Sequence, residues 1–82
     1  MIFSATVQVM PLKELLDPQG KAVMSGLGNL GLTGINDVRI GKNINLQVEA
    51  ESAEAARQIA EVAAKKLLAN PVMEMFEITI SN

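Results

Sequence analysis

Four residue types that carry much of protein chemistry are absent from this chain of 82 residues: histidine, cysteine, tryptophan and tyrosine. Without cysteine there is no disulfide framework, no thiolate metal site and no cysteine nucleophile. Without histidine the chain lacks the side chain whose unperturbed pKa best suits proton transfer near neutrality, which is also the commonest metal ligand. We therefore expect no catalytic residue, no metal site and no bound cofactor, and an independent enzyme is the least favoured interpretation.

Aromatic residues and clustered positive charge are also scarce. Phe3 and Phe76 are the only aromatic residues, so a surface on which nucleic-acid bases could stack is lacking. The net charge of −2, with scattered basic residues, argues against binding to a phosphate backbone. The apolar runs are too short to span a membrane, and Met1 to Met10 lacks the features of a signal peptide. We expect a cytoplasmic protein that binds neither nucleic acid nor membrane.

What is present is enough apolar sequence for one small folded domain. Hydrophobic residues make up 49% of the chain and charged residues 20%, a composition too apolar for a disordered tail. We assign residues 1–82 to a single domain. A domain of this size buries only about 60 to 65% of its unfolded surface, so an oligomer or a larger complex would supply further burial.

Periodic apolar residues predict six secondary-structure elements. They are a strand at 2–10, a helix at 18–30, strands at 35–40 and 44–50, a helix that starts after Ser52 and ends before Pro71, and a strand at 72–80. Residues 41–43 are expected to form a turn with Asn43 in the left-handed conformation, across which Ile40 and Ile44 pair. This order predicts an α+β ferredoxin-like two-layer sandwich, β-α-β-β-α-β, with a four-stranded antiparallel sheet and both helices on one face.

Each expected helix carries one apolar stripe that we assign to the core. The stripes are Val23, Leu27 and Leu30 in the first helix, and Ala56, Ile59, Ala60, Ala63 and Leu67 in the second. The opposite sheet face stays uncovered, with Ser4, Thr6, Gln8, Arg39, Asn45, Gln47, Glu49, Met75, Glu77 and Thr79 expected on it. A small domain with an open sheet face is a natural candidate for self-association.

Three local motifs allow a chemical interpretation. Residues 26–31 spell G-x-G-x-x-G, but they fall inside and at the end of a helix, where no helix N-terminus meets a phosphate, so we treat the match as accidental. Asp17 suits a helix N-cap and Pro18 the first helical position. Arg39 and Lys42 flank the expected turn, where they could hold a phosphate or a partner's carboxylate, or could simply be solvated.

Three blocks of the sequence resemble one family. The blocks are Asp17-Pro18-Gln19-Gly20 followed by Ala22-Val23, then Asp37-Val38-Arg39-Ile40-Gly41-Lys42, and then Lys66-Leu67-Leu68-Ala69-Asn70 with Val72 and Glu74. In this order they are similar to the PurS family, the small subunits of phosphoribosylformylglycinamidine synthase in purine biosynthesis. The resemblance spans nearly the whole chain.

The resemblance implies an accessory subunit without an active site of its own. In that family a glutaminase subunit releases ammonia, and a large synthase subunit uses ATP and magnesium to convert formylglycinamide ribonucleotide to the formylglycinamidine. The small subunit would form a homodimer or a dimer of dimers, bridge the other two subunits and assist ammonia transfer. The residues that the resemblance suggests for partner contact are Asp17, Gln19, Gly20, Arg39, Lys42, Asn70 and Glu74.

An alternative from another class stays open at this point. Open-faced domains of the predicted topology also serve as dimeric regulatory modules, which bind a small ligand such as an amino acid near the first strand-to-helix loop. Stabilisation of the isolated chain by an amino acid would favour that alternative.

Overall fold

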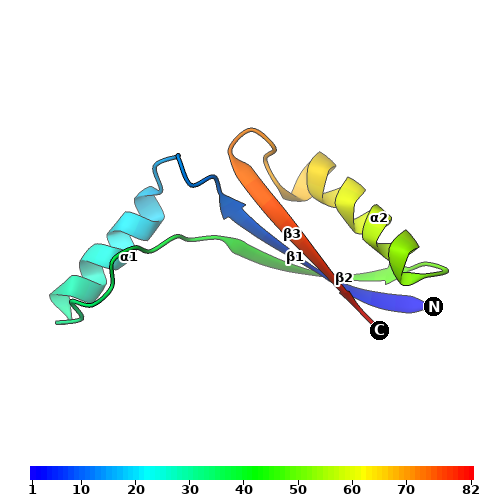
Figure 1. Ribbon diagram of the computed structural model, residues 1–82, viewed down its shortest axis with the longest axis horizontal. Coiled ribbons are helices and arrows are strands. Elements are labelled where there is room, and N and C mark those ends of the chain that lie inside the picture. The colour runs from blue at the N-terminus through cyan, green and yellow to red at the C-terminus, as the bar shows by residue number, and fades with distance from the viewer.

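A computed structural model describes residues 1–82 as an α+β chain with the element order β-α-β-α-β (Figure 1). The elements are β1 (Ile2–Pro11), α1 (Pro18–Asn29), β2 (Lys42–Glu49), α2 (Ala53–Ala63), a π-helical turn η1 (Ala64–Leu68) that extends α2, and β3 (Glu74–Ser81). None of the helices has the length and apolar character that crossing a membrane would require.

The three strands form one antiparallel sheet in the order β2-β1-β3. In its register Val7 lies between Ile44 of β2 and Ile78 of β3. Alternate residues of β1 point to the same face, and those on the inner face, Phe3, Ala5, Val7 and Val9, are buried. The alternation seen in the sequence therefore predicts both the strand and its buried face correctly.

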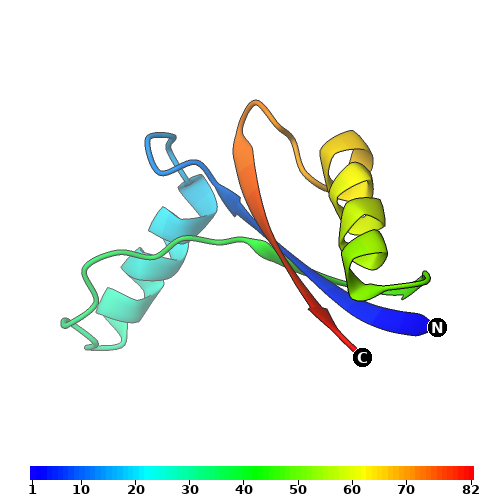
Figure 2. The same cartoon turned by 45° about the vertical axis from the view of Figure 1, so that its right-hand side comes forward.

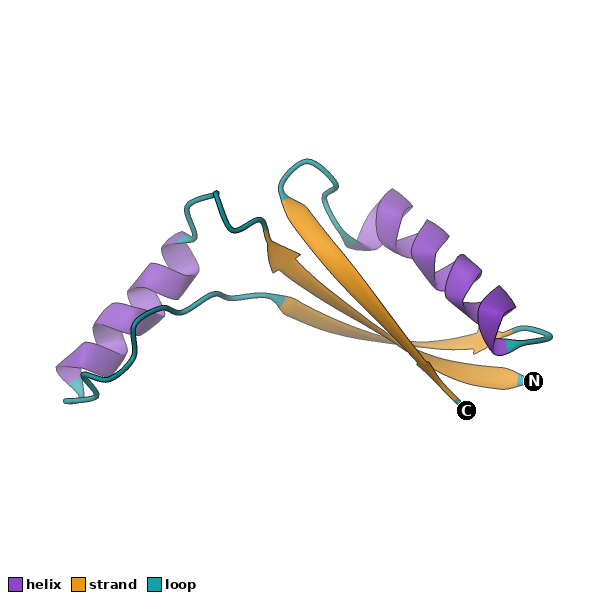
Figure 3. Cartoon of the chain, viewed as in Figure 1, coloured by secondary structure: helices purple, strands orange, loops and turns teal.

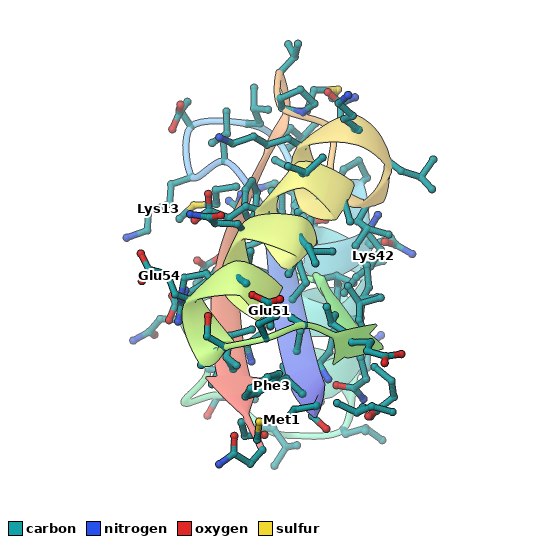
Figure 4. The ribbon with its side chains drawn as sticks, turned by 90° about the vertical axis from the view of Figure 1, so that its right-hand side faces the viewer. Met1, Phe3, Lys13, Lys42, Glu51 and Glu54 are labelled. Atoms are coloured by element: carbon teal, nitrogen blue, oxygen red, sulfur yellow. The ribbon has the colours of Figure 1, made fainter.

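Helix α2 covers the inner face of the sheet (Figure 2). Ser52 begins it as an N-cap, with its hydroxyl oxygen accepting a hydrogen bond from the Ala55 amide at 3.1 Å. Ala56, Ala60 and Ala64 are fully buried, and their small side chains let the helix approach the strands closely. In Figure 4, Glu51 and Glu54 lie at the start of α2, and Phe3 lies below its first turn.

The expected apolar stripe of α2 is only partly correct. Ala56 and Ala60 are buried as expected, but Ala63 is only half-buried and the neighbouring Ala64 is buried in its place. Ile59 is 49% exposed and Leu67 is 84% exposed. The π-helical turn rotates the chain at its C-terminal end, so that Leu68 instead of Leu67 packs against the core.

The predicted hairpin at residues 35–50 is wrong, and so is the fourth strand. Residues 35–41 form a connection without strand pairing, and Lys42 and Asn43 already belong to β2 (Figure 3). No residue other than glycine has a positive φ, so Asn43 is not left-handed, and Ile44 pairs with Val7 instead of Ile40. Arg39, assigned to the open sheet face, lies in this connection and outside the sheet.

Helix α1 does not lie on the sheet, which corrects the expectation that both helices cover one face. It extends away from the strands at the end of two connections, residues 12–17 and 30–41 (Figures 1 and 2). The radius of gyration is 16.1 Å, whereas a compact chain of this length has about 12 Å. We call α1 the arm and these two connections the neck.

Candidate functional site

The motif Asp17-Pro18-Gln19-Gly20 forms the start of the arm. Asp17 is the N-cap of α1, and its Oδ1 accepts a hydrogen bond from the Gly20 amide at 3.0 Å. Pro18 occupies the first turn, where its missing N–H leaves no intrahelical bond unmade. Both roles agree with the sequence analysis.

The same carboxylate also reaches across the neck. Oδ2 of Asp17 accepts a hydrogen bond from the Ile40 amide at 2.8 Å, although 23 positions separate these residues in the chain. The Ile40 and Gly20 amides, followed by the positive charge of Arg39, lower the pKa of Asp17 below its ordinary value. Asp17 thus stays ionised at neutral pH and ties the two connections of the neck together.

Gly20 is needed because the two connections approach closely at this point. A Cβ there would collide with the carbonyl oxygen of Val38, and it would lie 2.7 Å from Oδ2 of Asp17. Gly20 is the one buried residue of α1. This requirement for space explains the glycine of the motif, which helix capping alone does not require.

Arg39 is used inside the chain. Its guanidinium donates hydrogen bonds to three consecutive carbonyl oxygens, those of Pro11 at 3.5 Å, Leu12 at 2.6 Å and Lys13 at 3.3 Å. These carbonyls belong to the end of β1 and the first connection, so Arg39 holds the second connection against the first. An arginine fork suits several neighbouring acceptors better than the single ammonium of lysine.

Lys42, Asn70 and Glu74 form a second group at the end of the sheet next to the neck. Glu74 accepts a hydrogen bond from the Asn70 amide at 2.7 Å and lies 3.9 Å from the Lys42 ammonium. The Asn70 side chain accepts one from the Val72 amide at 3.0 Å and so closes the turn before β3. Figure 4 shows Lys42 and Lys13 reaching outward on opposite sides of the chain.

The seven residues singled out in the sequence therefore fall into three sets. Asp17, Gly20 and Arg39 meet in the neck, whereas Lys42, Asn70 and Glu74 meet beside it. Gln19 is exposed and makes no side-chain hydrogen bond. Of the seven, its side chain is the one with no role in holding this chain together.

Two features of the site were missed in the sequence. A Cβ at Gly41 would collide with the carbonyl oxygen of Val9 and with Met10, so β2 begins in close contact with the end of β1. The G-K dipeptide was interpreted as a turn, and only the distant partner in β1 could have corrected that. The second feature is a hollow of about 470 Å³ beside the neck, with Lys21, Asp37 and Arg39 in its wall.

The apolar stripe of the arm faces outward. Val23 is 42% exposed, Met24 38% and Leu30 76%, while Leu27 is half-buried. The arm ends in a Schellman motif, in which Gly31 has φ +85° and the Leu32 amide donates to the Leu27 carbonyl. A defined amphipathic helix is therefore held away from its own core with its apolar side uncovered.

No group of three acidic side chains in the structure is placed to hold a metal ion. The fold and the site define a class of small α+β proteins in which charged side chains of two connections bind backbone groups and one helix packs on no sheet of its own chain. The family model of PurS, described as phosphoribosylformylglycinamidine (FGAM) synthase, matches residues 4–82. The chain belongs to this family, which confirms the resemblance drawn from the three blocks.

Individual relatives support the assignment over nearly the full length. The phosphoribosylformylglycinamidine synthase subunit PurS of Mycobacterium leprae is 46% identical over 77 residues, which is 92% of this chain and 91% of the relative. PurS of Methanocaldococcus jannaschii has a TM-score of 0.88 at 32% identity and covers 98% of this chain and 96% of its own. A chain of PurLQS from Thermotoga maritima has a TM-score of 0.91 at 32% identity, with 99% of each chain covered.

Proposed function

We propose that this chain is an accessory subunit of phosphoribosylformylglycinamidine synthase that bridges the large synthase subunit and the glutaminase subunit and assists ammonia transfer. The observation that carries the proposal is the full-length likeness to a chain of the Thermotoga maritima PurLQS structure. The lack of histidine and cysteine is consistent with an active site that resides in other subunits. ATP and magnesium would then be used on the synthase subunit.

The structure also supports self-association through the arm. Val23, Met24, Leu27 and Leu30 lie on one side of the arm, and neither the sheet nor α2 covers this side. Burying such side chains is the main favourable term in association. On the sheet, Ile44 and Leu46 of β2 are only half-buried beside α2 and offer an apolar surface of the same kind.

The outer edge of β2 is open as well. The hydrogen bond from the Ala50 amide to the Met1 carbonyl continues the β1–β2 register, so the even-numbered residues of β2 bond to β1. The odd-numbered residues therefore direct their backbone groups to an edge at which no strand pairs. An unpaired edge of this kind is a template for a further strand.

A second copy of the chain fits both features. In the predicted ferredoxin-like fold, residues 35–40 would pair with this edge and α1 would pack beside α2. Here residues 35–41 continue into β2 without turning back, so the same contacts can form only between two copies (Figure 3). We infer a homodimer in which each chain places its arm and residues 35–40 on the sheet of the other. Both chains then use the same surfaces, as in a dimer closed by a two-fold axis.

Two measurements test these proposals separately. Sedimentation equilibrium of the isolated chain should give twice the mass of the chain, and a monomer at all concentrations would overturn the homodimer. Reconstitution with the synthase and glutaminase subunits, in the presence of glutamine and nucleotide, should give a stable complex and raise glutamine-dependent product formation. Absence of both effects would overturn the bridging role.

The contact residues remain predictions that the same reconstitution can examine. Gln19 is the sharpest candidate because its side chain has no internal role. Gln19→Ala should leave the mass and unfolding temperature of the isolated chain unchanged and weaken the complex. Unchanged complex formation would leave the motif with its architectural role alone.

A further inference from the structure

We propose that Asp17 and Arg39 are positioning residues that together fix the direction in which the arm leaves the sheet. Neither the sheet nor α2 performs this task, because neither packs against α1 (Figure 1). Within one chain, the direction of the arm is therefore determined by the neck. Two unsupported connections of six and twelve residues would leave such a helix free to swing.

The hydrogen bonds across the neck are reciprocal. Asp17 stands on the first connection and binds the Ile40 amide of the second at 2.8 Å. Arg39 stands on the second and binds carbonyl oxygens on the first, with the Leu12 carbonyl at 2.6 Å. Arg39 and Ile40 are adjacent, so these hydrogen bonds join the two connections at one point, with one side chain contributed by each connection. We call this pair with its backbone acceptors and donors the clasp.

Close backbone contacts give the clasp its stiffness. Gly20 brings the first turn of α1 against Val38, and Gly41 brings the start of β2 against Val9. One contact lies on the arm side of the clasp and the other on the sheet side. A bend at the clasp would have to separate at least one of these contacts, so the arm and the sheet behave as one rigid unit.

The functional consequence rests on the proposed homodimer. When two chains exchange arms, the angle between arm and sheet decides whether the second arm returns to the first chain. A fixed angle favours the closed dimer, whereas a loose one also permits open assemblies of several chains. The clasp would thereby set the spacing of the surfaces that the dimer presents to the other subunits.

The variant Asp17→Asn separates the clasp from the helix cap. Asparagine is as good an N-cap as aspartate, so Oδ1 can still accept from the Gly20 amide. The second oxygen is replaced by an amide nitrogen, which is a donor and faces the N–H of Ile40. Arg39→Met is the complementary variant, because it removes the guanidinium that donates the three hydrogen bonds and leaves the cap intact.

The direction of the arm can be measured by double electron–electron resonance. The chain has no native cysteine, so Ser25→Cys on α1 and Thr79→Cys on β3 take spin labels at chosen positions. Labelled chains diluted into an excess of unlabelled chains report only the distance within one chain. Gln19→Ala is the matched control, since it changes the same turn of α1 without touching the clasp.

We expect a narrow distance distribution for the parent chain and for Gln19→Ala, and a width at least doubled for Asp17→Asn and Arg39→Met. Circular dichroism should show unchanged helix content in all of them. An unchanged width in both clasp variants overturns the proposal. If Asp17→Asn loses helix content, Arg39→Met decides alone. A monomeric parent chain refutes the homodimer but not the clasp, because the measured distance lies within one chain.

Discussion

The sharpest quantitative prediction concerns glycine positions in α1 that look alike in the sequence. Gly20→Ala adds a methyl group where the carbonyl oxygen of Val38 already stands, and the carbonyl carbon would be 3.0 Å away. The obstacle is backbone, so it cannot rotate aside. Inserting a methyl group into a filled space costs about 1–3 kcal/mol. Because the obstacle is backbone, the cost lies in the upper part of this range, at about 2–3 kcal/mol. Alanine's higher helix propensity returns about 1 kcal/mol, so we expect a net loss of about 1–2 kcal/mol.

Gly28→Ala is the matched control with the opposite sign. No atom lies within 4 Å of the position that its Cβ would take, and Gly28 is inside the same helix. Here the propensity gain stands alone, and the free energy of unfolding should rise by about 0.5–1 kcal/mol. One substitution type in one helix is therefore expected to destabilise at the first position and stabilise at the second.

Thermal unfolding followed by circular dichroism measures the difference. For a domain of this size each 1 kcal/mol shifts the midpoint by roughly 4–8 °C, so the unfolding midpoint of Gly20→Ala should lie about 4–16 °C below that of the parent chain. All proteins must be compared at one chain concentration, because association raises apparent stability. If Gly20→Ala unfolds at or above the parent temperature, the assigned contact with Val38 is refuted.

Three further predictions follow from individual contacts. The Ile40 and Gly20 amides lower the pKa of Asp17, so its ionised form stabilises the fold above about pH 4, and this contribution is lost as the pH falls through the folded-state pKa. In urea unfolding, the difference in free energy of unfolding between the parent and Asp17→Asn should therefore shrink with acidification, and a constant difference would contradict this. Leu27→Ala should raise the dimer dissociation constant about 30-fold, the equivalent of about 2 kcal/mol, in sedimentation experiments, and an unchanged constant would exclude α1 from the interface. Glu74→Ala should lower the free energy of unfolding by about 0.5–1.5 kcal/mol, while Glu74→Gln keeps the acceptor for the Asn70 amide and should match the parent, since the exposed pair with Lys42 contributes little.

Much of the fold is predictable from the sequence because its strongest signals are local. The alternation in β1, the Ser52 cap and the Asp17-Pro18 start each depend on neighbouring residues, and each appears in the structure as expected. The α2 stripe is correct at Ala56 and Ala60 and wrong at Ile59, which is exposed in the middle of the helix. It is also wrong at its end, where the π-helical turn changes the period and buries Leu68 in place of Leu67. A shift of period within one helix has no clear signature in residue type.

The site is less predictable because its contacts join distant positions. Arg39 and Lys42 are exposed-looking cations in the sequence, and nothing local indicates that one holds three carbonyls while the other pairs with Glu74. The glycine of the Asp17 motif likewise depends on Val38, whose approach is visible only in three dimensions. For Asp17 the sequence predicts the cap but not the bond to Ile40.

The wrong hairpin has a particular physical cause. Residues 35–50 carry the apolar pattern of two strands, and this pattern is the same whether the chain turns back or continues straight. What decides between them is the neck, where Asp17 binds the Ile40 amide and Arg39 binds carbonyl oxygens at the end of β1 and just after it. Arg39 and Ile40 are thereby held against the connection that follows β1 instead of folding onto β2. Because strand pattern and pairing partner are separate pieces of information, the predicted strand at 35–40 can still be formed, on the sheet of a second copy. The hydrogen bonds of the clasp therefore explain both errors of the prediction. They keep residues 35–40 off the sheet of their own chain, and they hold α1 away from it.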